Sequence, residues 1–269
     1  MKIPFWKMHG AGNDFILADD RAGQFPTADK NWLVRISDRR RGIGSEGIIL
    51  IQPSSKATFR MRFFNPDGGE VDMCGNGARC VARLAHEIGA APVRMSIETE
   101  AGILRAEVIG DQVRLFMTDP KDWRLDKALQ LDGQSIRYSF VNSGVPHVVV
   151  EVPDVSKVDV QHMGSAIRYH SAFAPGGTNA NFITVTGPDT LQIRTYERGV
   201  EGETLACGTG IVASGLIAGI SGRVKPPVRI TTAGGDILEV SYSMLAGAPH
   251  EVTLLGPAAH VFQGTLEYT

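Results

Sequence analysis

The sequence predicts an α+β protein in which two similar domains each wrap mixed or antiparallel strands about a helix. Three observations support this fold class. The chain has 269 residues, enough for two domains. Four segments recur in the same order about 134 residues apart. Most of the remaining sequence predicts strands that are interrupted by Gly and Pro turns.

The internal repeat is clearest around two of the three cysteines. Cys74 opens "CGNGARCVARL", and Cys207 opens "CGTGIVASGLI" 133 residues later. Gly89 and Gly222 each lie fifteen residues beyond their cysteine, where a glycine is expected to end a helix. Three further pairs keep the same order and predict strands: "VRMSIETEAGILRAEV" with "VRITTAGGDILEVSY", "FRMRFFNPDGGE" with "LQIRTYERGVEGE", and "GIGSEGIILI" with "GGTNANFITV".

The repeat predicts an N-terminal half over residues 1–120 and a C-terminal half over residues 121–257. A last strand-like segment, residues 258–269, can return to either half, and we expect the first. Two helices are predicted in each half: residues 27–40 and the segment after Cys74, then residues 155–170 and the segment after Cys207. Residues 120–134, "PKDWRLDKALQLDGQ", are the best candidate for a linker.

Composition narrows the function classes. Lys and Arg number 27 and Asp and Glu 29, so no basic field predicts a nucleic-acid partner. No apolar run is long enough to span a membrane, and the N-terminus has no secretory signal pattern. Three cysteines are an odd number and predict free thiols in a reducing, cytoplasmic compartment. Cys74 and Cys80 are six residues apart, which does not fit a zinc site, so no metal is expected.

A cysteine at the start of a helix lies among backbone N–H groups at the positive end of the helix dipole. That field is worth up to ~2 kcal/mol, enough to lower a thiol pKa from about 8.5 toward about 7. The following glycines would let a carboxylate approach the N–H groups. Either cysteine alone would more often be a buried structural thiol than a catalytic one, but two at matched positions favour catalysis.

Two thiols on opposite sides of one α-carbon can invert it. One thiolate removes the α-proton, the opposite thiol returns a proton to the other face, and the N–H groups stabilise the charge on the carboxylate. With a substrate between them, the two thiols would titrate as a coupled pair that shares one proton. Cys80 lies six residues along the same helix from Cys74, and we interpret it as a core residue.

Several stretches identify the family that the chain resembles. They include "FWKMHGAGNDF", "RRRGIGSEG", "FFNPDGGEVDMCGNGARC", "GVPHVVVEV", "FAPGGTNANF" and "YERGVEGETLACGTG", and they run along the whole chain. The chain resembles diaminopimelate epimerases, which work without a cofactor. The resemblance implies two pseudo-symmetric domains, each a barrel-like sheet around a central helix, with the active site in the cleft between them. It also implies a homodimer that epimerises LL- to meso-diaminopimelate for lysine and peptidoglycan synthesis.

The resemblance also implies residue roles. Cys74 and Cys207 are the acid/base pair. The carboxylate at the reacting centre lies on the N–H groups of four residues: Gly75, Asn76, Gly208 and Thr209. The far end of the substrate, with its own ammonium and carboxylate, is held by Asn13, Asn65, Asn179, Glu197 and Arg198. His147 is a candidate auxiliary for proton transfer, with a structural Pro-His turn as the alternative.

The chain departs from the family pattern in two places. The family commonly has Gly-Asn-Pro-His where this chain has Gly144-Val145-Pro146-His147. Val145 cannot make the side-chain contact of that asparagine, so the contact is either missing or supplied by a neighbour such as Asn142 or Ser143. Also, "ERGVEGET" has one residue more than the common "ERGAGET". Both departures bear on substrate choice and leave the chemistry intact.

Two other functions remain open from the sequence. One is a racemase or epimerase of another amino acid, such as histidine or hydroxyproline, on the same fold. The pair Glu197 and Arg198 favours a substrate with a second amino-acid end and so argues for diaminopimelate. The other is a ligand-binding or thiol redox protein without catalysis, against which the retention of both cysteines with their glycines argues.

Overall fold

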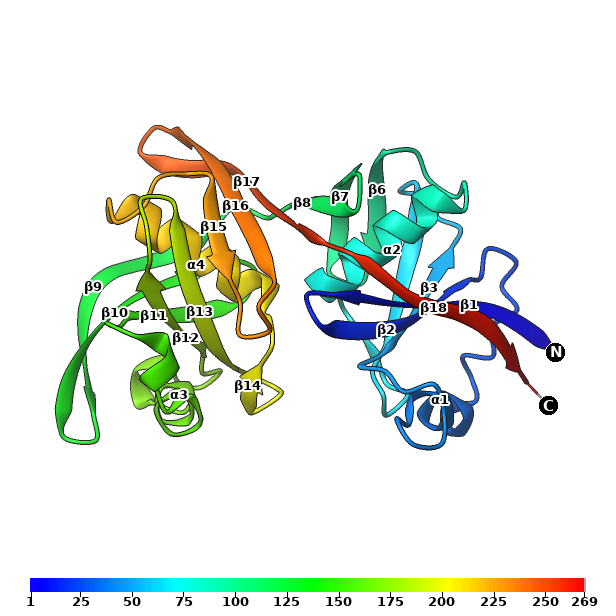
Figure 1. Ribbon diagram of the computed structural model, residues 1–269, viewed down its shortest axis with the longest axis horizontal. Helices are drawn as coiled ribbons and strands as arrows, with labels where there is room; N and C mark the ends of the chain where they lie inside the picture. The colour runs from blue at the N-terminus through cyan, green and yellow to red at the C-terminus, as the bar shows by residue number, and fades with distance from the viewer. Residues whose placement is uncertain (269) are drawn as a thin grey trace. The chain divides into compact units, whose positions relative to one another are not determined.

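The computed structural model describes residues 1–268 and divides into two compact units. Unit 1 contains residues 1–115 together with the segment that starts at Gly256, and unit 2 runs from Phe116 to Leu255. Each unit is a mixed sheet with a few helices, which confirms the α+β class (Figure 1). No helix in the described residues has the length and apolar character of a membrane span.

Unit 1 is a sheet in the order β18–β1–β2–β3–β4–β6–β7, with the short β5 also on β4. The C-terminal strand thus pairs with the N-terminal one. Its strands are β1 (Lys2–Gly10), β2 (Asn13–Asp19), β3 (Ile48–Gln52), β4 (Phe59–Phe64), β5 (Glu70–Val71), β6 (Arg94–Thr99), β7 (Gly102–Ile109) and β18 (Ala259–Glu267). Its helices are α1 (Lys30–Ser37) and α2 (Gly75–Glu87), and β8 (Gln112–Phe116) reaches the unit boundary.

Unit 2 is a sheet in the order β9–β10–β11–β12–β13–β15–β16–β17, with the short β14 also on β13. Its strands are β9 (Lys121–Leu131), β10 (Gln134–Asn142), β11 (Pro146–Glu151), β12 (Asn179–Val185), β13 (Thr190–Glu197), β14 (Gly202–Thr204), β15 (Val228–Thr231), β16 (Ile237–Leu245) and β17 (Ala248–Pro257). Its helices are α3 (Val160–Arg168) and α4 (Gly208–Ile220), with 3-10 turns at Val155–Lys157 and Ser171–Phe173.

The linker predicted over residues 120–134 is wrong, because most of that segment is β9 and pairs antiparallel with β10. Only Leu129 and Leu131 of this strand are buried. Apart from the half-buried Trp123, the other residues are exposed and include five charged side chains, which is common in strands at the edge of a sheet. A strand without an alternating apolar face resembles a linker in composition. For this reason the sequence of residues 120–134 predicted a linker.

The repeat in sequence is also a repeat in topology. In unit 1, β2 and β3 are parallel, β3 and β4 antiparallel, and β4 and β6 parallel. In unit 2 the same sequence of directions joins β11, β12, β13 and β15. All four paired segments found in the sequence lie on matching elements of the two units.

Both faces of each central sheet are covered by a helix. In unit 1, Ile48 and Leu50 of β3 pack with Leu33 of α1, while Ile49 between them reaches the first turn of α2. In unit 2, α4 is buried along most of its length and is surrounded by strands β10–β13, β15 and β16 (Figure 1). A strand that is covered by a helix on each face needs apolar side chains on both faces, and the run "IILI" of β3 is an example.

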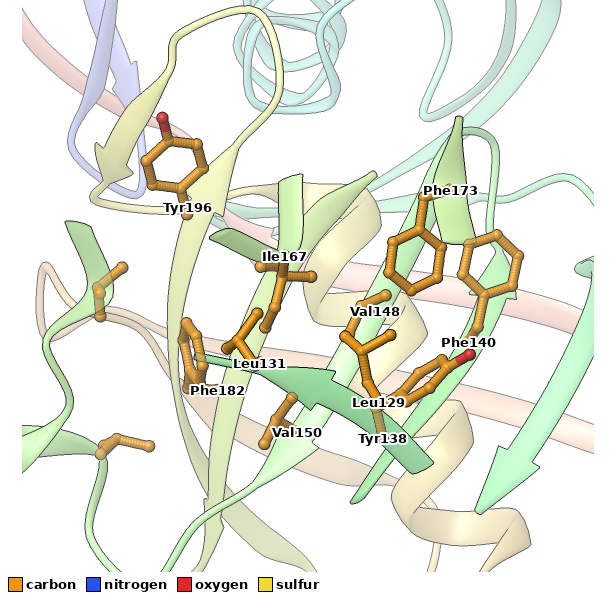
Figure 2. Packing of buried hydrophobic residues seen from close by; sticks show 13 residues of the cluster. Leu129, Leu131, Tyr138, Phe140, Val148, Val150, Ile167, Phe173, Phe182 and Tyr196 are labelled. Atoms are coloured by element: carbon orange, nitrogen blue, oxygen red, sulfur yellow. The ribbon is translucent and has the colours of Figure 1, made fainter. Parts of the chain in front are cut away.

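Helix α3 covers the other face of the unit 2 sheet, where it packs on β12 and β13. Figure 2 shows the side chains of this core. Val148 and Val150 of β11 and Ile167 of α3 belong to this core. The rings of Phe140 and Phe173 are stacked with centroids 6.0 Å apart. This packing leaves the alternate side chains of β11 and β12 on the α4 face of the sheet, where the candidate site lies.

Gly164 sets how closely α3 lies against β13. A Cβ at this position would be 2.3 Å from Cβ of Tyr196, a backbone-proximal atom that cannot move aside. We therefore expect Gly164→Ala to lower the free energy of unfolding by about 1–3 kcal/mol in urea titrations. Gln161→Ala, at an exposed position of the same helix, is the matched control and should change stability by less than about 0.5 kcal/mol. Equal stability of the two variants would contradict the close packing.

Candidate functional site

The two repeated cysteines each precede a helix of 13 residues. Cys74 is the N-cap of α2 and Cys207 the N-cap of α4, both with extended backbone angles. Neither sulfur makes the side-chain hydrogen bond that caps a helix start. Gly89 and Gly222 both have φ of +70°, which confirms the predicted helix ends.

The second glycine after each cysteine allows the helix to touch the sheet. A Cβ at Gly77 would lie 2.6 Å from Cδ1 of Ile49, and one at Gly210 would lie 2.3 Å from Oδ1 of Asn181. The first glycine differs, because a Cβ at Gly75 would meet nothing within 4 Å. The helix start is therefore tight on the sheet side and open beside the cysteine.

In unit 1 the sulfur of Cys74, which is half-buried, donates to Oδ1 of Asn13 at 3.6 Å. Nδ2 of Asn13 in turn donates to the carboxylate of Glu46 at 3.1 Å. The structure thus brings two predicted site residues together. Asn76 is buried, and its side-chain oxygen accepts from Arg79 at 2.9 Å. Its main-chain contact with a carboxylate remains a prediction.

A charged cluster supports this corner of unit 1 and was not found from the sequence. The buried Lys7 pairs with Asp14 at 2.5 Å, and Arg39 pairs with both Asp14 at 2.6 Å and Glu46 at 3.2 Å. Burial lowers the pKa of Lys7 against the opposing effect of Asp14. Burial would raise the pKa of Asp14, but hydrogen bonds from Arg39 and Lys7 outweigh it and lower that pKa. The ion pairs of Arg39 and the hydrogen bond from Asn13 hold Glu46 in this cluster.

Asn65 lies in the turn between β4 and β5, which leads to Cys74. Its N–H donates to Gly69 O at 2.8 Å and its carbonyl accepts from Gly68 N at 2.9 Å. The structure places it in the same unit as Asn13 and Cys74. Its predicted contact with substrate remains a prediction.

In unit 2 the sulfur of Cys207 lies 3.6 Å from Oγ1 of Thr209, and the same hydroxyl is 2.9 Å from Nε2 of His147. His147 is fully buried. Burial and, to a smaller extent, the positive charge of Arg198 lower the pKa of His147 to about 3. The imidazole is therefore neutral at physiological pH. Three predicted site residues, Cys207, Thr209 and His147, lie together.

The predicted distal residues of unit 2 surround the turn after β13. Oδ1 of Asn179 accepts from the main-chain N–H of Arg198 at 2.8 Å, and its Nδ2 donates to Pro146 O at 2.9 Å. Both ends of this amide thus bind main chain and hold the turn in place. Glu197 accepts from Thr204 at 2.9 Å. Nη1 of Arg198 donates to Gly176 O at 3.2 Å. The carboxylate of Glu197 and the guanidinium of Arg198, both predicted to hold the distal end of a substrate, are thus each oriented by a hydrogen bond.

The additional residue of "ERGVEGET" forms a supported turn. Glu201 has φ of +57°, and its carboxylate accepts from Gly199 N at 3.1 Å and from the guanidinium of Arg168 at 3.0 Å. The longer loop is therefore fastened to α3. The sequence showed the extra residue but gave no signal for its partner Arg168, which lies 33 positions away.

Ser143 and Asn142, the two candidates to replace the asparagine that is absent at position 145, both make other hydrogen bonds. Ser143 is buried and donates to Thr209 O in the first turn of α4 at 2.8 Å. Asn142 accepts from Gly144 N at 3.1 Å and closes the turn before β11. Ser143 therefore holds the helix start.

Cys80 provides an internal control for the thiols. It is fully buried, and burial raises its pKa to about 12, so its thiolate is almost absent at neutral pH. We expect iodoacetamide at pH 8 to label Cys74 in the folded protein and to spare Cys80, as read by peptide mass spectrometry. Denaturation in urea should expose all three cysteines. Labelling of both at equal rates in the folded state would contradict the buried placement.

Solved structures of similar fold come from several enzyme groups. A phenazine biosynthesis protein of the PhzF family from Bacillus anthracis superimposes with a TM-score of 0.73 at 16% identity, over 100% of both chains. A hydroxyproline epimerase from Agrobacterium vitis superimposes with a TM-score of 0.68 at 18% identity, over 98% of this chain and 91% of that one. At such low identity these likenesses confirm the fold and carry nothing about the substrate.

Sequence comparison is more specific. The chain is 40% identical to the diaminopimelate epimerase of Aquifex aeolicus over 98% of both chains. It is 42% identical to that of Chlorobaculum tepidum, over 96% of this chain and 99% of the relative. The family model described as diaminopimelate epimerase matches residues 5–123 and 139–258, which cover both units. This chain, with its paired cysteines at matching helix starts, belongs to the diaminopimelate epimerase family.

Proposed function

We propose that this protein is an isomerase that converts LL-diaminopimelate to meso-diaminopimelate for lysine and peptidoglycan biosynthesis. The observation that carries the proposal is the matched pair of N-cap cysteines, Cys74 and Cys207, on helices of equal length in two units of the same topology. Membership of the family supports the substrate. The resemblance further supports a cytoplasmic homodimer.

The proposed reaction is a two-base inversion without a cofactor. One cysteine thiolate takes the α-proton, and the electron pair of the broken C–H bond delocalises into the carboxylate. The thiol of the other cysteine then protonates the opposite face, so that the two sulfurs exchange protonation states. The main-chain N–H groups of residues 75, 76, 208 and 209 would stabilise the developing charge, assisted by the helix dipoles. Two-base inversion requires both thiols to reach the same α-carbon.

The distal end of the substrate carries one ammonium and one carboxylate, which require opposite charges. Arg198 offers a planar fork of donors for the carboxylate, and Glu197 offers an acceptor for the ammonium. Asn13 and Asn65 are the proposed amide partners in unit 1, while Asn179 acts through the turn that it holds. This pairing of charges supports diaminopimelate over an amino acid with an apolar side chain.

The cysteine pair gives a direct test. We expect Cys74→Ala and Cys207→Ala each to reduce epimerisation at least about 100-fold, because each removes one of the two proton carriers. Stability in urea should change little for Cys74→Ala, since that side chain is half-buried. The measurement is conversion of LL- to meso-diaminopimelate by chiral chromatography, with Cys80→Ala as the matched cysteine control. Substantial turnover by either active-site variant would refute the two-base scheme.

Substrate identity is tested by deuterium exchange at the α-carbon in D₂O. LL-diaminopimelate should exchange, whereas L-lysine, L-histidine and trans-4-hydroxy-L-proline should not, because none of the three offers a second amino-acid end. Exchange into only one of the other amino acids would replace the proposal with a racemase of that compound.

The role of Arg198 is tested by steady-state kinetics. Arg198→Lys should raise KM for diaminopimelate more than it lowers kcat, since a single ammonium replaces a bidentate guanidinium.

A further inference from the structure

We propose that Asn181 is a positioning residue which, through His147 and Thr209, makes Cys207 the thiolate of the cysteine pair in the resting enzyme. The inference rests on the proposed function, because it assigns starting protonation states to the two proposed acid/base thiols. It is carried by a line of hydrogen bonds inside unit 2 whose direction is determined at one end.

The direction is determined at Asn181, which is fully buried on β12. Its Nδ2 donates to Val148 O at 2.8 Å, and its Oδ1 accepts from the Thr195 hydroxyl at 3.0 Å. A main-chain carbonyl can only accept, so the amide cannot be turned around without placing two oxygens together. The second hydrogen of the same Nδ2 must then point at Nδ1 of His147, 3.1 Å away.

The orientation of Asn181 determines the donor and acceptor roles of His147 and Thr209. Because Nδ1 of His147 accepts, the single proton of the neutral imidazole is on Nε2 and is donated to Oγ1 of Thr209 at 2.9 Å. With that oxygen already accepting, the Thr209 hydroxyl can donate its own hydrogen to the sulfur of Cys207 at 3.6 Å. A donor aimed at sulfur favours the thiolate over the thiol. His147 is thus held as a neutral donor.

The matching positions of unit 1 show that the fold does not need these polar groups. Strand register places Phe15, Ile49 and Phe63 of unit 1 where unit 2 has His147, Asn181 and Thr195. In unit 1 these positions are apolar, with Phe15 and Phe63 in edge contact at 5.9 Å. Burying polar groups is costly unless every bond is made, so their presence beneath Cys207 alone indicates a function at that thiol.

The thiol of unit 1 has the opposite polarity. Glu46 accepts from Nδ2 of Asn13, which turns Oδ1 of Asn13 toward the sulfur of Cys74. An amide oxygen can only accept, and it therefore favours Cys74 as the protonated donor. The resting pair is accordingly Cys207 as base and Cys74 as acid.

The test does not need a substrate, so it is independent of which amino acid the enzyme turns over. Alkylation of each cysteine by iodoacetamide is followed by peptide mass spectrometry across pH 5–10. In the wild type, the midpoint for Cys207 should lie below that for Cys74. Asn181→Ala and Thr209→Val should each slow alkylation of Cys207 about tenfold at pH 7 and raise its midpoint, while the midpoint for Cys74 stays constant.

Two matched controls separate this role from packing. Thr195→Val removes the other partner of the same amide and keeps both Nδ2 donors, and Thr209→Ser keeps the hydroxyl. Both should retain the wild-type profile of Cys207. If Asn181→Ala also keeps that profile, if Thr195→Val shifts it equally, or if Cys74 has the lower midpoint in the wild type, the proposal is overturned.

A spectroscopic measurement on the wild-type protein covers the case in which a variant fails to fold. Long-range ¹H–¹⁵N correlation spectra, assigned by the signals lost in His147→Gln, report which ring nitrogen carries the proton. We expect Nε2 of His147 to be protonated and Nδ1 unprotonated, without titration between pH 5 and 8. A proton on Nδ1, or an imidazolium at neutral pH, would overturn the proposal.

Discussion

The arrangement of each unit depends on one close contact, in which the first turn of a helix lies directly on the sheet. Gly77 and Gly210 allow this contact, since a Cβ at either position would overlap a side chain of the strand beneath. The contact fixes the helix end, and with it the residue just before the helix. A cysteine at that N-cap is therefore held by packing and has no need of a hydrogen bond of its own to the helix. The thiols are positioned by the core.

The same contact explains why the side chains beneath the helix matter for chemistry. They lie within reach of the first turn, so a change from apolar to polar residues there alters the surroundings of the cysteine without altering the fold. Unit 1 has Phe15 and Ile49 in this place, and unit 2 has His147 and Asn181. Two halves with one topology thus give their cysteines different electrostatic surroundings.

Much of this could be predicted from the sequence, because the two halves can be compared with each other. The repeat located the helices after Cys74 and Cys207, their glycine ends and the strands around them. The edge strand β9 was taken for a linker because only two of its residues are buried. The ion pairs that support the elements around the site could not be predicted. Arg168 pairs with Glu201, and Lys7 pairs with Asp14, only because the fold brings them together. No regular spacing in the sequence indicates either pair. Asn181 carried a weak signal, since it stands two positions after Asn179 and so shares its face of the strand.

The pairing of β18 with β1 has a consequence for how the chain matures. Unit 2 is one continuous stretch of chain, whereas unit 1 needs the strand that is synthesised after all of unit 2. On the ribosome, unit 2 can thus complete its sheet while β1 still has an open edge. The N-terminal half, although made first, is finished last, and Cys74 enters a completed unit only when the final strand has been added. A chain that stops before β18 would carry both cysteines and a complete unit 2, but its unit 1 would expose an unpaired strand edge open to association with other chains.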